Sequence, residues 1–559
     1  MPNVIDYGWM LLMAAILVSL AGAIIRTTAA LHILQLEGYK SGRFLRWLIN
    51  NPKRLIDVKE GMAMGCLLVL GLIIAFLKLR TLVLPLFLLA WIAIEAYFIV
   101  RRKRIKAKKP LVYTARARRL LGLSIALLAA AVIGVMLLSG GLSLWRLTGD
   151  QLYSQFLILC ALTFWLNQLA AISLTAANVI IYPLEETIKA CYLRSAKNKI
   201  RKLHPKVIAI TGSYGKTSTK HILNTILSQK FKVLMTPESY NTPMGICKVI
   251  RGQLEPAYQI FIVEMGAYKR GDIRDLCKLV SPEIGILTAI GPQHLERFKS
   301  IDNIARAKYE LVESLPGNGI AVFNDDDKIC SGLADKTKIK AVRYSLDRLD
   351  DKVELTARDI QNTSQGLTLA VEKHSGEAAQ IETRLLGKNN VYNILAAAAV
   401  ALECGLSLDE ISRAAKRLEP IPHRLQLIPG AGGVTVIDDG FNANPLGARA
   451  ALEVLESFNH DQGRKVLVTP GMIELGDREF EQNKIFGAEA ARVCDFVILV
   501  GPVRTKPILE GLREAGFPKE KTIVVESLAE ATKRLKNLLK AGDVVLFEND
   551  LPDTYSEDV

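Results

Sequence analysis

The sequence predicts an α-helical membrane segment of about five helices, followed by α/β domains. Three patterns lead to this fold class. Five long apolar runs lie within the first 200 of the 559 residues; a strand, a glycine-rich loop and a helix follow one another from Val207; and strand-like and helical stretches alternate towards the C-terminus. A chain of this length exceeds one compact core. We therefore expect a transmembrane helical domain at 1–200, a central domain at 201–422 and a C-terminal domain at 423–559.

The apolar runs lie at about 9–25, 61–78, 81–100, 120–139 and 152–182. Each is about long enough to cross a bilayer. A buried core helix is the alternative for any single run, but five runs in succession with few internal charges favour the membrane. The first run follows Asp6 and no basic segment, and it lacks a small-residue cleavage site. We therefore expect a retained helix and not a cleaved signal peptide.

Charge is divided unevenly along the chain. Residues 1–200 carry 24 Lys and Arg against 8 Asp and Glu, whereas the remainder carries 47 against 48. The basic residues gather in the connections after the first and third runs, and such loops stay in the cytoplasm. This predicts a multi-pass protein of the cytoplasmic membrane with residues after 182 in the cytoplasm. Eight scattered cysteines without a C-x-x-C pair suit that reducing compartment.

The basic excess flanks apolar segments, so it indicates membrane topology, and we expect no nucleic-acid binding. The lipid bilayer is the expected partner, and the short basic and aromatic stretch 41–49 is expected to lie along the headgroups. Glu95, Asn167 and Gln168 lie inside apolar runs. They leave two alternatives open, a transport path or polar packing between helices, and we favour packing because no repeat pairs these segments.

The central domain opens with an apolar strand, Val207–Ile210, followed by T-G-S-Y-G-K-T-S. Glycines let the backbone wrap a polyphosphate, a lysine places charge on the outer phosphates, and a hydroxyl can ligate Mg²⁺. The spacing T-G-x-x-G-K-T is shorter than the common form, and alone it indicates only a nucleotide. The candidate ATP-binding residues here are Gly212, Ser213, Gly215, Lys216, Thr217 and Ser218.

This loop and the motifs after it resemble the Mur ligase family, most of all the branch that adds D-alanyl-D-alanine to a muramoyl tripeptide. An ordered set of motifs is more specific than any single one, and this set covers about 205–500. In chain order the motifs are F-I-V-E-M-G-A, I-G-P-Q-H-L-E-R-F, I-A-R-A-K-Y-E-L, F-N-D-D-D, L-G-K-N-N-V-Y-N-I-L-A-A-A-A, P-H-R, V-I-D-D-G-F-N-A-N-P and P-G-M-I-E-L-G.

The resemblance implies a role for a residue in most of these motifs. Glu264 and His294 would bind Mg²⁺ together with Thr217, two ions in all. Lys308 stands where many members have a lysine carbamylated by CO₂, and it is a catalytic candidate with Lys216, Glu264 and His294. The remaining candidates are Asn390 and Asn393 on the adenine side, Arg424 and Asp439 for the nucleotide, and Asn241 and Thr242 in a loop that contacts the substrate.

Several of these residues have simpler alternative interpretations. His294 could be a structural histidine, Lys308 a solvated surface lysine, and Asn390 a helix cap. Asp325–Asp327 are expected to be turn residues after a strand.

The C-terminal part is predicted to be a parallel, Rossmann-like α/β domain. Strand-like runs at 466–468, 496–500, 522–525 and 544–547 alternate with amphipathic helical stretches. In the family this domain closes over ATP, which would bring Arg424 and Asp439 to the nucleotide.

Two departures from the family pattern bear on the substrate. The helical segment stands where the family has its UDP-sugar domain. L-F-E-N-D-L-P-D-T-Y stands near the C-terminus, where the D-alanyl-D-alanine branch has K-G-S-R. A basic substrate contact is thus replaced by acidic residues.

The resemblance implies an ATP- and Mg²⁺-dependent ligase that joins a carboxylate to an amine through an acyl phosphate. We expect an amino acid or dipeptide to be added to a cell-wall or envelope precursor, and whether that precursor is lipid-linked stays open. One alternative is a polyglutamate-type polymer synthase. The other is a membrane protein whose nucleotide domain senses ATP without catalysis, or powers transport.

Overall fold

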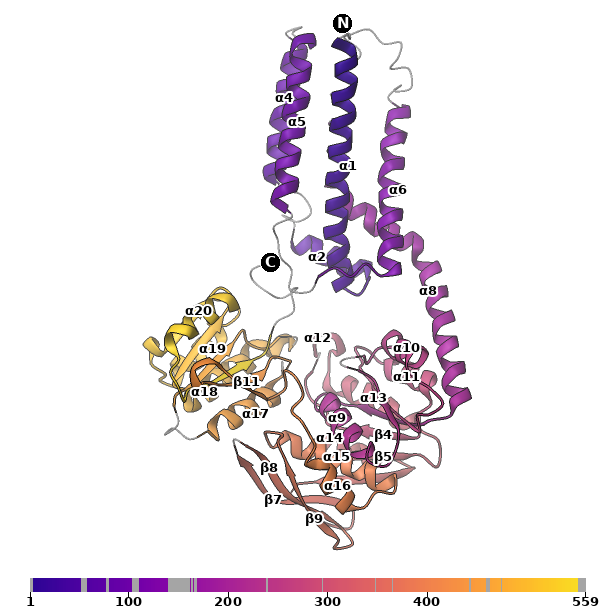
Figure 1. The fold of residues 1–559 in the computed structure, drawn as a ribbon, viewed down its shortest axis with the longest axis vertical. Coiled ribbons are helices and arrows are strands. Elements are labelled where there is room, and N and C mark those ends of the chain that lie inside the picture. The colour runs from indigo at the N-terminus through magenta and orange to yellow at the C-terminus, as the bar shows by residue number, and fades with distance from the viewer. Residues whose placement is uncertain are drawn as a thin grey trace. The chain divides into compact units, whose positions relative to one another are not determined.

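A computed structural model describes residues 4–51, 58–76, 80–102, 110–138, 161, 164, 168–237, 240–293, 295–346, 348–363, 365–441, 444–458, 463–473 and 475–550. The chain divides into two compact units, Met1–Ile188 and Lys189–Val559. Each unit is described by itself below, with the element labels of Figure 1.

The first unit is helical. α1 packs against α5 and α6, and α4 packs against α5, so these four helices run side by side (Figure 1). Apolar side chains of this unit form two clusters, one that buries Met64, Phe87 and Trp91 and one that buries Leu31, Phe44 and Leu120. The helices are α1 (Val4–Leu36), α2 (Ser41–Asn50), α4 (Val58–Phe76), α5 (Arg80–Arg102), α6 (Ala115–Leu138) and α8 (Ala170–Leu203), which continues into the second unit.

The expectation of about five spanning helices is met only in part. Among the described residues, one helix, Ala14–Leu36, is long and apolar enough to cross a membrane. Leu86–Val100 is apolar but shorter. Most of the first half of the fifth run lies outside the described residues.

Polar side chains inside this unit join helices to one another. Ser19 Oγ donates to Glu95 Oε2 at 2.7 Å, and Arg26 donates to Gln168 Oε1 at 2.5 Å. Arg26 also pairs with Glu60 at 2.5 Å, with both side chains almost fully buried. Glu95 and Gln168 therefore serve helix-to-helix packing, as the favoured interpretation predicted, whereas Asn167 lies outside the described residues.

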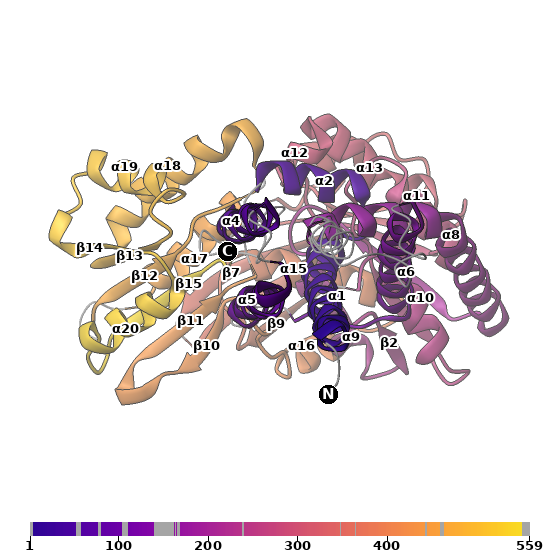
Figure 2. The ribbon, with the colours of Figure 1, turned by 90° about the horizontal axis from the view of Figure 1, so that it is seen from above.

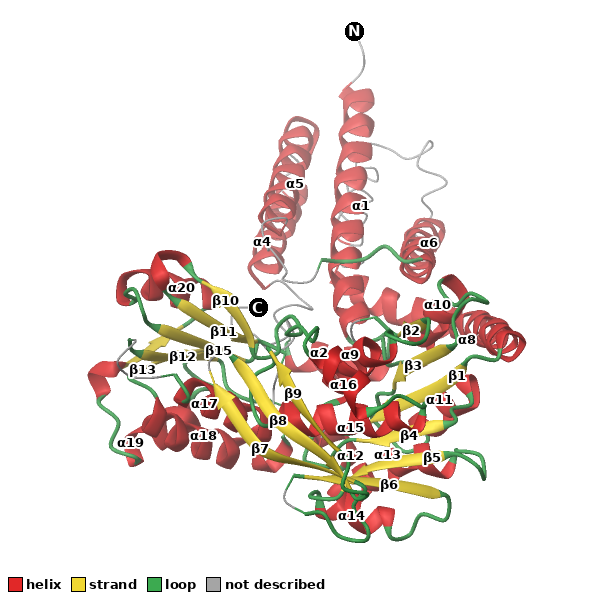
Figure 3. Ribbon diagram, turned by 60° about the horizontal axis from the view of Figure 1, so that its bottom comes forward, coloured by secondary structure: helices red, strands yellow, loops and turns green. Residues whose placement is uncertain are grey.

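The second unit contains a nine-stranded sheet in the order β2-β3-β1-β4-β5-β6-β7-β8-β9. The pairs from β2 to β7 are parallel, and β7–β8 and β8–β9 are antiparallel, an extension that the sequence did not predict (Figure 3). The strands are β1 (Lys206–Thr211), β2 (Val233–Met235), β3 (Ile260–Glu264), β4 (Ile284–Leu287), β5 (Ile320–Asn324), β6 (Lys340–Ser345), β7 (Leu355–Thr363), β8 (Gly366–Lys373) and β9 (Ala378–Thr383).

Helices cover both faces of this sheet, so its central strands are apolar on both sides. Ile208 and Ile210 of β1 face one core, and Val207 and Ala209 face the other. The first core packs against α9 (Lys216–Leu227), α15 (Asn389–Glu403) and α16 (Leu408–Ala415). The second packs against the end of α8, α10 (Pro243–Gly252), α11 (Asp272–Val280), α13 (Ile301–Glu313) and α14 (Lys328–Ala334), with α12 (Leu295–Phe298) as a short connector.

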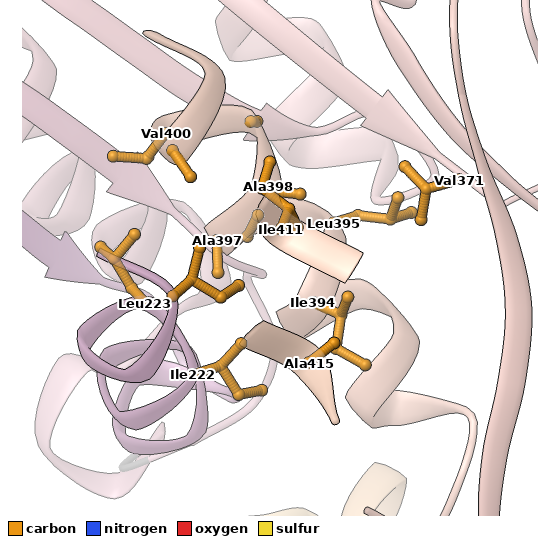
Figure 4. Close-up of a cluster of buried hydrophobic side chains, with 14 of the residues drawn as sticks. Ile222, Leu223, Val371, Ile394, Leu395, Ala397, Ala398, Val400, Ile411 and Ala415 are labelled. Atoms are coloured by element: carbon orange, nitrogen blue, oxygen red, sulfur yellow. The ribbon is translucent and has the colours of Figure 1, made fainter. Parts of the chain in front are cut away.

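The small side chains of α15 let α9 approach it closely. Ile222 and Leu223 of α9 lie against Ile394 and Ala397 of α15 (Figure 4). This contact fixes the helix that follows the glycine loop relative to the helix that carries Asn390 and Asn393.

The C-terminal sheet has the order β10-β11-β15-β12-β13-β14 and is parallel except for β10. α17, α18 and α19 pack on one face and α20 on the other (Figure 2). The α/β prediction is thus confirmed for the chain after α8. The elements are β10 (Gln426–Pro429), β11 (Thr435–Asp439), α17 (Pro445–Glu456), β12 (Lys465–Thr469), α18 (Glu479–Val493), β13 (Phe496–Val500), α19 (Lys506–Glu514), β14 (Thr522–Val525), α20 (Leu528–Leu538) and β15 (Val544–Glu548).

Candidate active site

The candidate site lies at the carboxyl ends of three neighbouring parallel strands, where open α/β sheets bind their ligands. β3, β1 and β4 are adjacent, and they end at Glu264, Thr211 and Leu287. The glycine loop leaves β1 and enters α9 at Lys216. The first turn of a helix has free N–H groups and a positive dipole end, so this arrangement favours a bound polyphosphate.

Two glycines of the loop have conformations and surroundings that exclude a side chain. Gly212 has φ 153° and Gly215, the residue before α9, has φ 78°. A Cβ on Gly212 would lie 1.9 Å from Thr288 Oγ1, and one on Gly215 would lie 2.4 Å from Asn393 Oδ1. Ser213 fixes the loop to the next strand connection, since its N–H donates to the Ala289 carbonyl at 2.7 Å. The loop is therefore a fixed backbone cradle, as a phosphate site requires.

Two lysines from different helices meet at the loop. Lys216 Nζ donates to the Gly212 carbonyl at 2.7 Å and to the Ser213 carbonyl at 3.1 Å. Lys308, from α13, donates to the same Gly212 carbonyl at 2.7 Å. Its side chain is buried, so its interpretation as a solvated surface lysine is wrong.

Burial lowers the pKa of both lysines, and a nearby positive charge adds to the shift of each. Burial lowers the pKa of Lys216 to about 8, with Glu264 opposing and Arg424 adding to the shift. Burial, and then the Lys216 charge, hold the pKa of Lys308 well below its usual range. The lowered pKa of Lys308 favours the neutral amine, which is the form that reacts with CO₂.

Glu264 lies beside the loop in a buried ion pair. Its Oε2 is 3.0 Å from Lys220 Nζ, and both side chains are buried. Burial alone would raise the pKa of Glu264, but the Lys220 and Lys216 ammonium groups and the Thr217 hydroxyl, which hydrogen-bonds to it, bring that pKa below its usual value. Glu264 is therefore an ionised carboxylate next to Thr217, an oxygen pair of the kind that Mg²⁺ prefers.

The two proposed substrate-loop residues differ in their contacts. Asn241 Nδ2 donates to Glu264 Oε1 at 3.4 Å, which brings it to the site. Thr242 is the N-cap of α10, and its hydroxyl accepts from the Gly245 N–H at 3.3 Å. Its observed contact is structural.

Asn393 connects α15 to the helix after the loop. Its Oδ1 accepts from the Thr219 hydroxyl at 3.1 Å, and its Nδ2 donates to Asn390 Oδ1 at 3.0 Å. Asn390 in turn donates to the Leu386 carbonyl at 2.8 Å. The N-cap of α15 is Lys388, so the capping interpretation of Asn390 is wrong.

The three aspartates after β5 have structural contacts, as expected for turn residues. Asp325 pairs with Arg343 at 3.1 Å, and Asp326 accepts from the Leu346 N–H at 2.8 Å. Asp327 caps α14 and also accepts from the Ile290 N–H at 2.8 Å. That last bond helps to hold the 288–293 connection beside the glycine loop. His294 follows this connection directly and lies outside the described residues.

The C-terminal domain places its candidate residues at the end of β11 and in the segment before β10. Arg424 is close enough to Lys216 for its charge to lower the pKa of that lysine. Asp439 is buried, and its Oδ1 accepts from the Leu425 N–H at 3.1 Å. Its neighbour Asp438 pairs with His423 at 2.7 Å. The charge of Arg424 therefore acts on the lysine of the glycine loop, and Asp439 has a structural contact.

Two residues at or near these sites were not predicted. Lys220 is fully buried beside Glu264, and Glu548 is fully buried next to Asp439 in the β11–β15 register. The sequence held a weak signal for each: Lys220 lies one helical turn after Lys216, and Glu548 ends an apolar strand. Neither signal distinguishes a buried charge from a solvated one.

The residues present fit ATP and Mg²⁺. The two glycines leave no room for side chains, the loop carries a lysine, and the carboxylate and hydroxyl beside it are hard oxygen donors. Mg²⁺ is commonly held by one or two carboxylates together with substrate phosphates, so a complete protein cage is not required. No cluster of three metal-binding side chains of the His, Cys, Asp and Glu types occurs within the described ranges.

Comparison with known proteins supports the same conclusion. Residues 210–401 match the Mur ligase middle domain, and residues 423–548 match the Mur ligase glutamate ligase domain. A UDP-N-acetylmuramoyl-tripeptide–D-alanyl-D-alanine ligase of Mycobacterium leprae is 32% identical over 365 residues, which are 61% of this chain and 70% of that protein.

Solved structures share the fold. MurF from Acinetobacter baumannii superposes with a TM-score of 0.59 at 28% identity, over 66% of this chain and 79% of that one. MurF ligase from Thermotoga maritima in complex with ADP gives 0.58 at 25% identity, over 66% and 82%.

A glycine phosphate loop, two converging lysines and a buried carboxylate at the edge of a parallel sheet define the site of an ATP-dependent ligase that joins an acid to an amino acid or peptide. The chain belongs to the Mur ligase family. Members of this family use ATP and Mg²⁺.

Proposed function

We propose that this chain is a multi-pass enzyme of the cytoplasmic membrane that adds an amino acid or dipeptide to a peptidoglycan or other envelope precursor. The observation that carries the proposal is the convergence of Lys216, Lys308 and the Glu264 carboxylate at one phosphate loop, in a chain of the Mur ligase family. The relatives named for D-alanyl-D-alanine ligation support a peptide-bearing precursor as the acceptor.

The reaction follows from the chemistry of amide formation. A free carboxylate has no good leaving group, so the γ-phosphoryl group of ATP is first transferred to a carboxylate oxygen, giving an acyl phosphate and ADP. The amine nitrogen then attacks the carbonyl carbon, the C–O bond to phosphate breaks, and the amine loses a proton.

The residues divide this work. Lys216 and the loop N–H groups hold the phosphates, and Lys308 lies where it can act on the transferred group. Thr217, Glu264 and His294 would hold Mg²⁺, for which we propose two ions, and the metal neutralises charge on the phosphoryl oxygens. The remaining assignments are Gly212, Ser213, Gly215 and Ser218 around the phosphates, Asn390, Asn393, Arg424 and Asp439 around the nucleoside, and Asn241 and Thr242 near the substrate.

The helical unit supports a membrane-bound acceptor. We assign 1–200 to about five membrane helices, 201–422 to the ATP-binding domain and 423–559 to the closing domain, with the last two in the cytoplasm. A soluble UDP-sugar peptide needs no membrane enzyme, whereas a lipid-linked precursor stays at the bilayer. We therefore favour a lipid-linked acceptor.

A polyglutamate-type synthase is the second candidate, and one observation bears on it. Glu548, Asn549 and Asp550 occupy the segment where the D-alanyl-D-alanine branch has K-G-S-R, and Glu548 is buried in the C-terminal domain. Acidic side chains in that position would repel the two carboxylates of glutamate more than the single carboxylate of D-alanyl-D-alanine, so this segment weighs against the second candidate and favours an amine with less negative charge.

ADP release by the purified full-length chain in lipid nanodiscs tests the proposal. Release should require Mg²⁺, an acceptor extract and an amine together, and the amine that supports it distinguishes D-alanyl-D-alanine from glutamate. Steady ADP release without any amine would contradict a ligase and favour an ATPase.

Lys216→Ala serves as the inactive variant in this assay. We expect a loss of at least about a hundredfold, or about 3 kcal/mol of transition-state stabilisation. Lys230→Ala, at an exposed position after the same helix, should retain activity. Equal activity of the two variants would contradict the assignment of this loop as the phosphate-binding loop.

A further inference from the structure

Lys220 is a buried charge that the proposed reaction does not yet use. It lies one helical turn after Lys216 on α9, its side chain has no exposed surface, and its Nζ is 3.0 Å from Glu264 Oε2. Removing both charges from water costs free energy that apolar residues of similar volume would not. We therefore expect this ion pair, which lies next to the glycine loop, to have a role other than stability.

The two oxygens of Glu264 have unequal contacts. Oε2 accepts the 3.0 Å charge-assisted bond from Lys220, whereas Oε1 accepts from Asn241 Nδ2 at 3.4 Å. A charge-assisted bond at 3.0 Å is much stronger than a neutral one at 3.4 Å. Of these two contacts, Lys220 therefore makes the stronger one, to Oε2, and the Thr217 hydroxyl, which would also ligate the metal, hydrogen-bonds to the same carboxylate.

We propose that Lys220 is a positioning residue for the magnesium site, holding Glu264 Oε2 so that Oε1 alone is presented to the metal that accompanies ATP. The inference rests on the proposed role of Glu264 as a metal ligand. Mg²⁺ requires near-octahedral geometry with short ligand distances, so the orientation of its carboxylate matters. Partners that orient a metal ligand commonly change metal affinity by 10- to 100-fold when they are removed.

A purely structural pair would behave differently from a positioning pair. Arginine at this site retains the positive charge, but its planar fork engages both oxygens of a carboxylate. Lys220→Arg should therefore retain the ion pair and withdraw Oε1 from the metal. Lys220→Met removes the charge and frees both oxygens.

The test measures binding of a fluorescent ADP analogue to the full-length chain, once with Mg²⁺ and once with EDTA. The dissociation constant in EDTA divided by that in Mg²⁺ is the ratio that reports the contribution of the metal separately from that of the nucleotide. We expect the ratio to fall at least tenfold in Lys220→Met and Lys220→Arg, while the EDTA value changes less than threefold. Lys230→Met, the same substitution at an exposed lysine after α9, should leave the ratio unchanged.

Two further outcomes make the result decisive. If Lys220→Met does not fold, Lys220→Arg decides, and a wild-type ratio in that variant overturns the proposal. Glu264→Gln separates the role of Lys220 from the role of Glu264 as a metal ligand, on which it rests. If Glu264→Gln loses the metal effect and the Lys220 variants retain it, only the role of Lys220 fails; if Glu264→Gln retains it, the metal role of Glu264 fails as well.

Discussion

At the residue scale, the site is defined by charges that the fold removes from water. Lys216, Lys220, Glu264 and Lys308 lie around one loop although they come from three elements. The sequence could identify Lys216 and Glu264 because each follows a strand within a motif. It could not identify Lys220, because a lysine on a helix is usually solvated, whereas this one is buried where α9 packs against the sheet.

Lys308 gives the first residue-scale prediction. The lowered pKa leaves its amine free to form an N–C bond with CO₂ and release a proton, and the resulting anion could help to hold Mg²⁺. With ¹³C-bicarbonate, we expect a carbamate signal in the NMR spectrum that is missing from Lys308→Ala. We also expect Lys308→Ala to be inactive and formate to restore part of its activity. Full activity in Lys308→Arg would show that only positive charge is needed and would exclude a carbamate.

Glu548 gives the second residue-scale prediction, which concerns the pH dependence of stability. Burial, and then the adjacent Asp439 carboxyl, hold the pKa of Glu548 well above its usual value. The folded chain therefore binds a proton here that the unfolded chain has released above about pH 4.5, so this group destabilises the fold increasingly as pH rises towards the folded pKa. Glu548→Gln should raise Tm at pH 8 by more than at pH 5. Glu520→Gln, which removes an exposed charge from the same domain, is the control. An equal change in Tm at both pH values in Glu548→Gln would refute the raised pKa of Glu548.

At the element scale, the glycine loop depends on the packing of α9 against α15. The sequence predicted the strand, loop and helix because the apolar run and the glycines are local signals. It could not predict that Asn393, 178 residues after Gly215, closes the other side of the loop. The antiparallel strands β7 to β9 were also missed, because their partly exposed residues give a weaker apolar pattern than the buried residues of parallel strands.

Gly215→Ala tests this packing. The added Cβ would meet Asn393 Oδ1 at 2.4 Å on a backbone with φ 78°, so both sterics and conformation oppose it. We expect at least a tenfold loss of ADP affinity, measured by titration, together with a lower Tm. Gly252→Ala is the matched control, since a Cβ added there would have nothing within 4 Å and the residue ends a helix with an ordinary φ. Wild-type affinity in Gly215→Ala would mean that the loop is not the nucleotide site.

At the scale of the whole molecule, the chain forms two compact units, divided along the sequence after Ile188. The charge also changes along the sequence, from a basic, apolar part at residues 1–200 to a charge-balanced remainder. The sequence could not identify the acceptor, because none of its motifs resembles the family's UDP-sugar domain. One described helix of the helical unit is long and apolar enough to cross a membrane. Because this unit stands where the family has its UDP-sugar domain, any difference in how the acceptor is held has to come from it.

We predict the topology of that unit from its charged loops. A reporter fused after residue 110 should be cytoplasmic, and one fused near residue 145 should be outside, because ten Lys and Arg lie between 101 and 119. Paired alkaline phosphatase and fluorescent protein fusions measure both positions. The opposite pattern would place the ligase part away from ATP and reverse the proposed localisation.

The most direct test of the central claim is mass spectrometry of lipid-linked envelope precursors from cells with and without the gene, complemented by the wild-type chain or by Lys216→Ala. A membrane-bound ligase predicts a precursor heavier by one amino acid or dipeptide residue in cells with the wild-type chain, and its loss both in the deletion and in the Lys216→Ala strain. Identical lipid-linked precursors in all strains, with a change confined to soluble UDP-linked peptides, would contradict a lipid-linked acceptor.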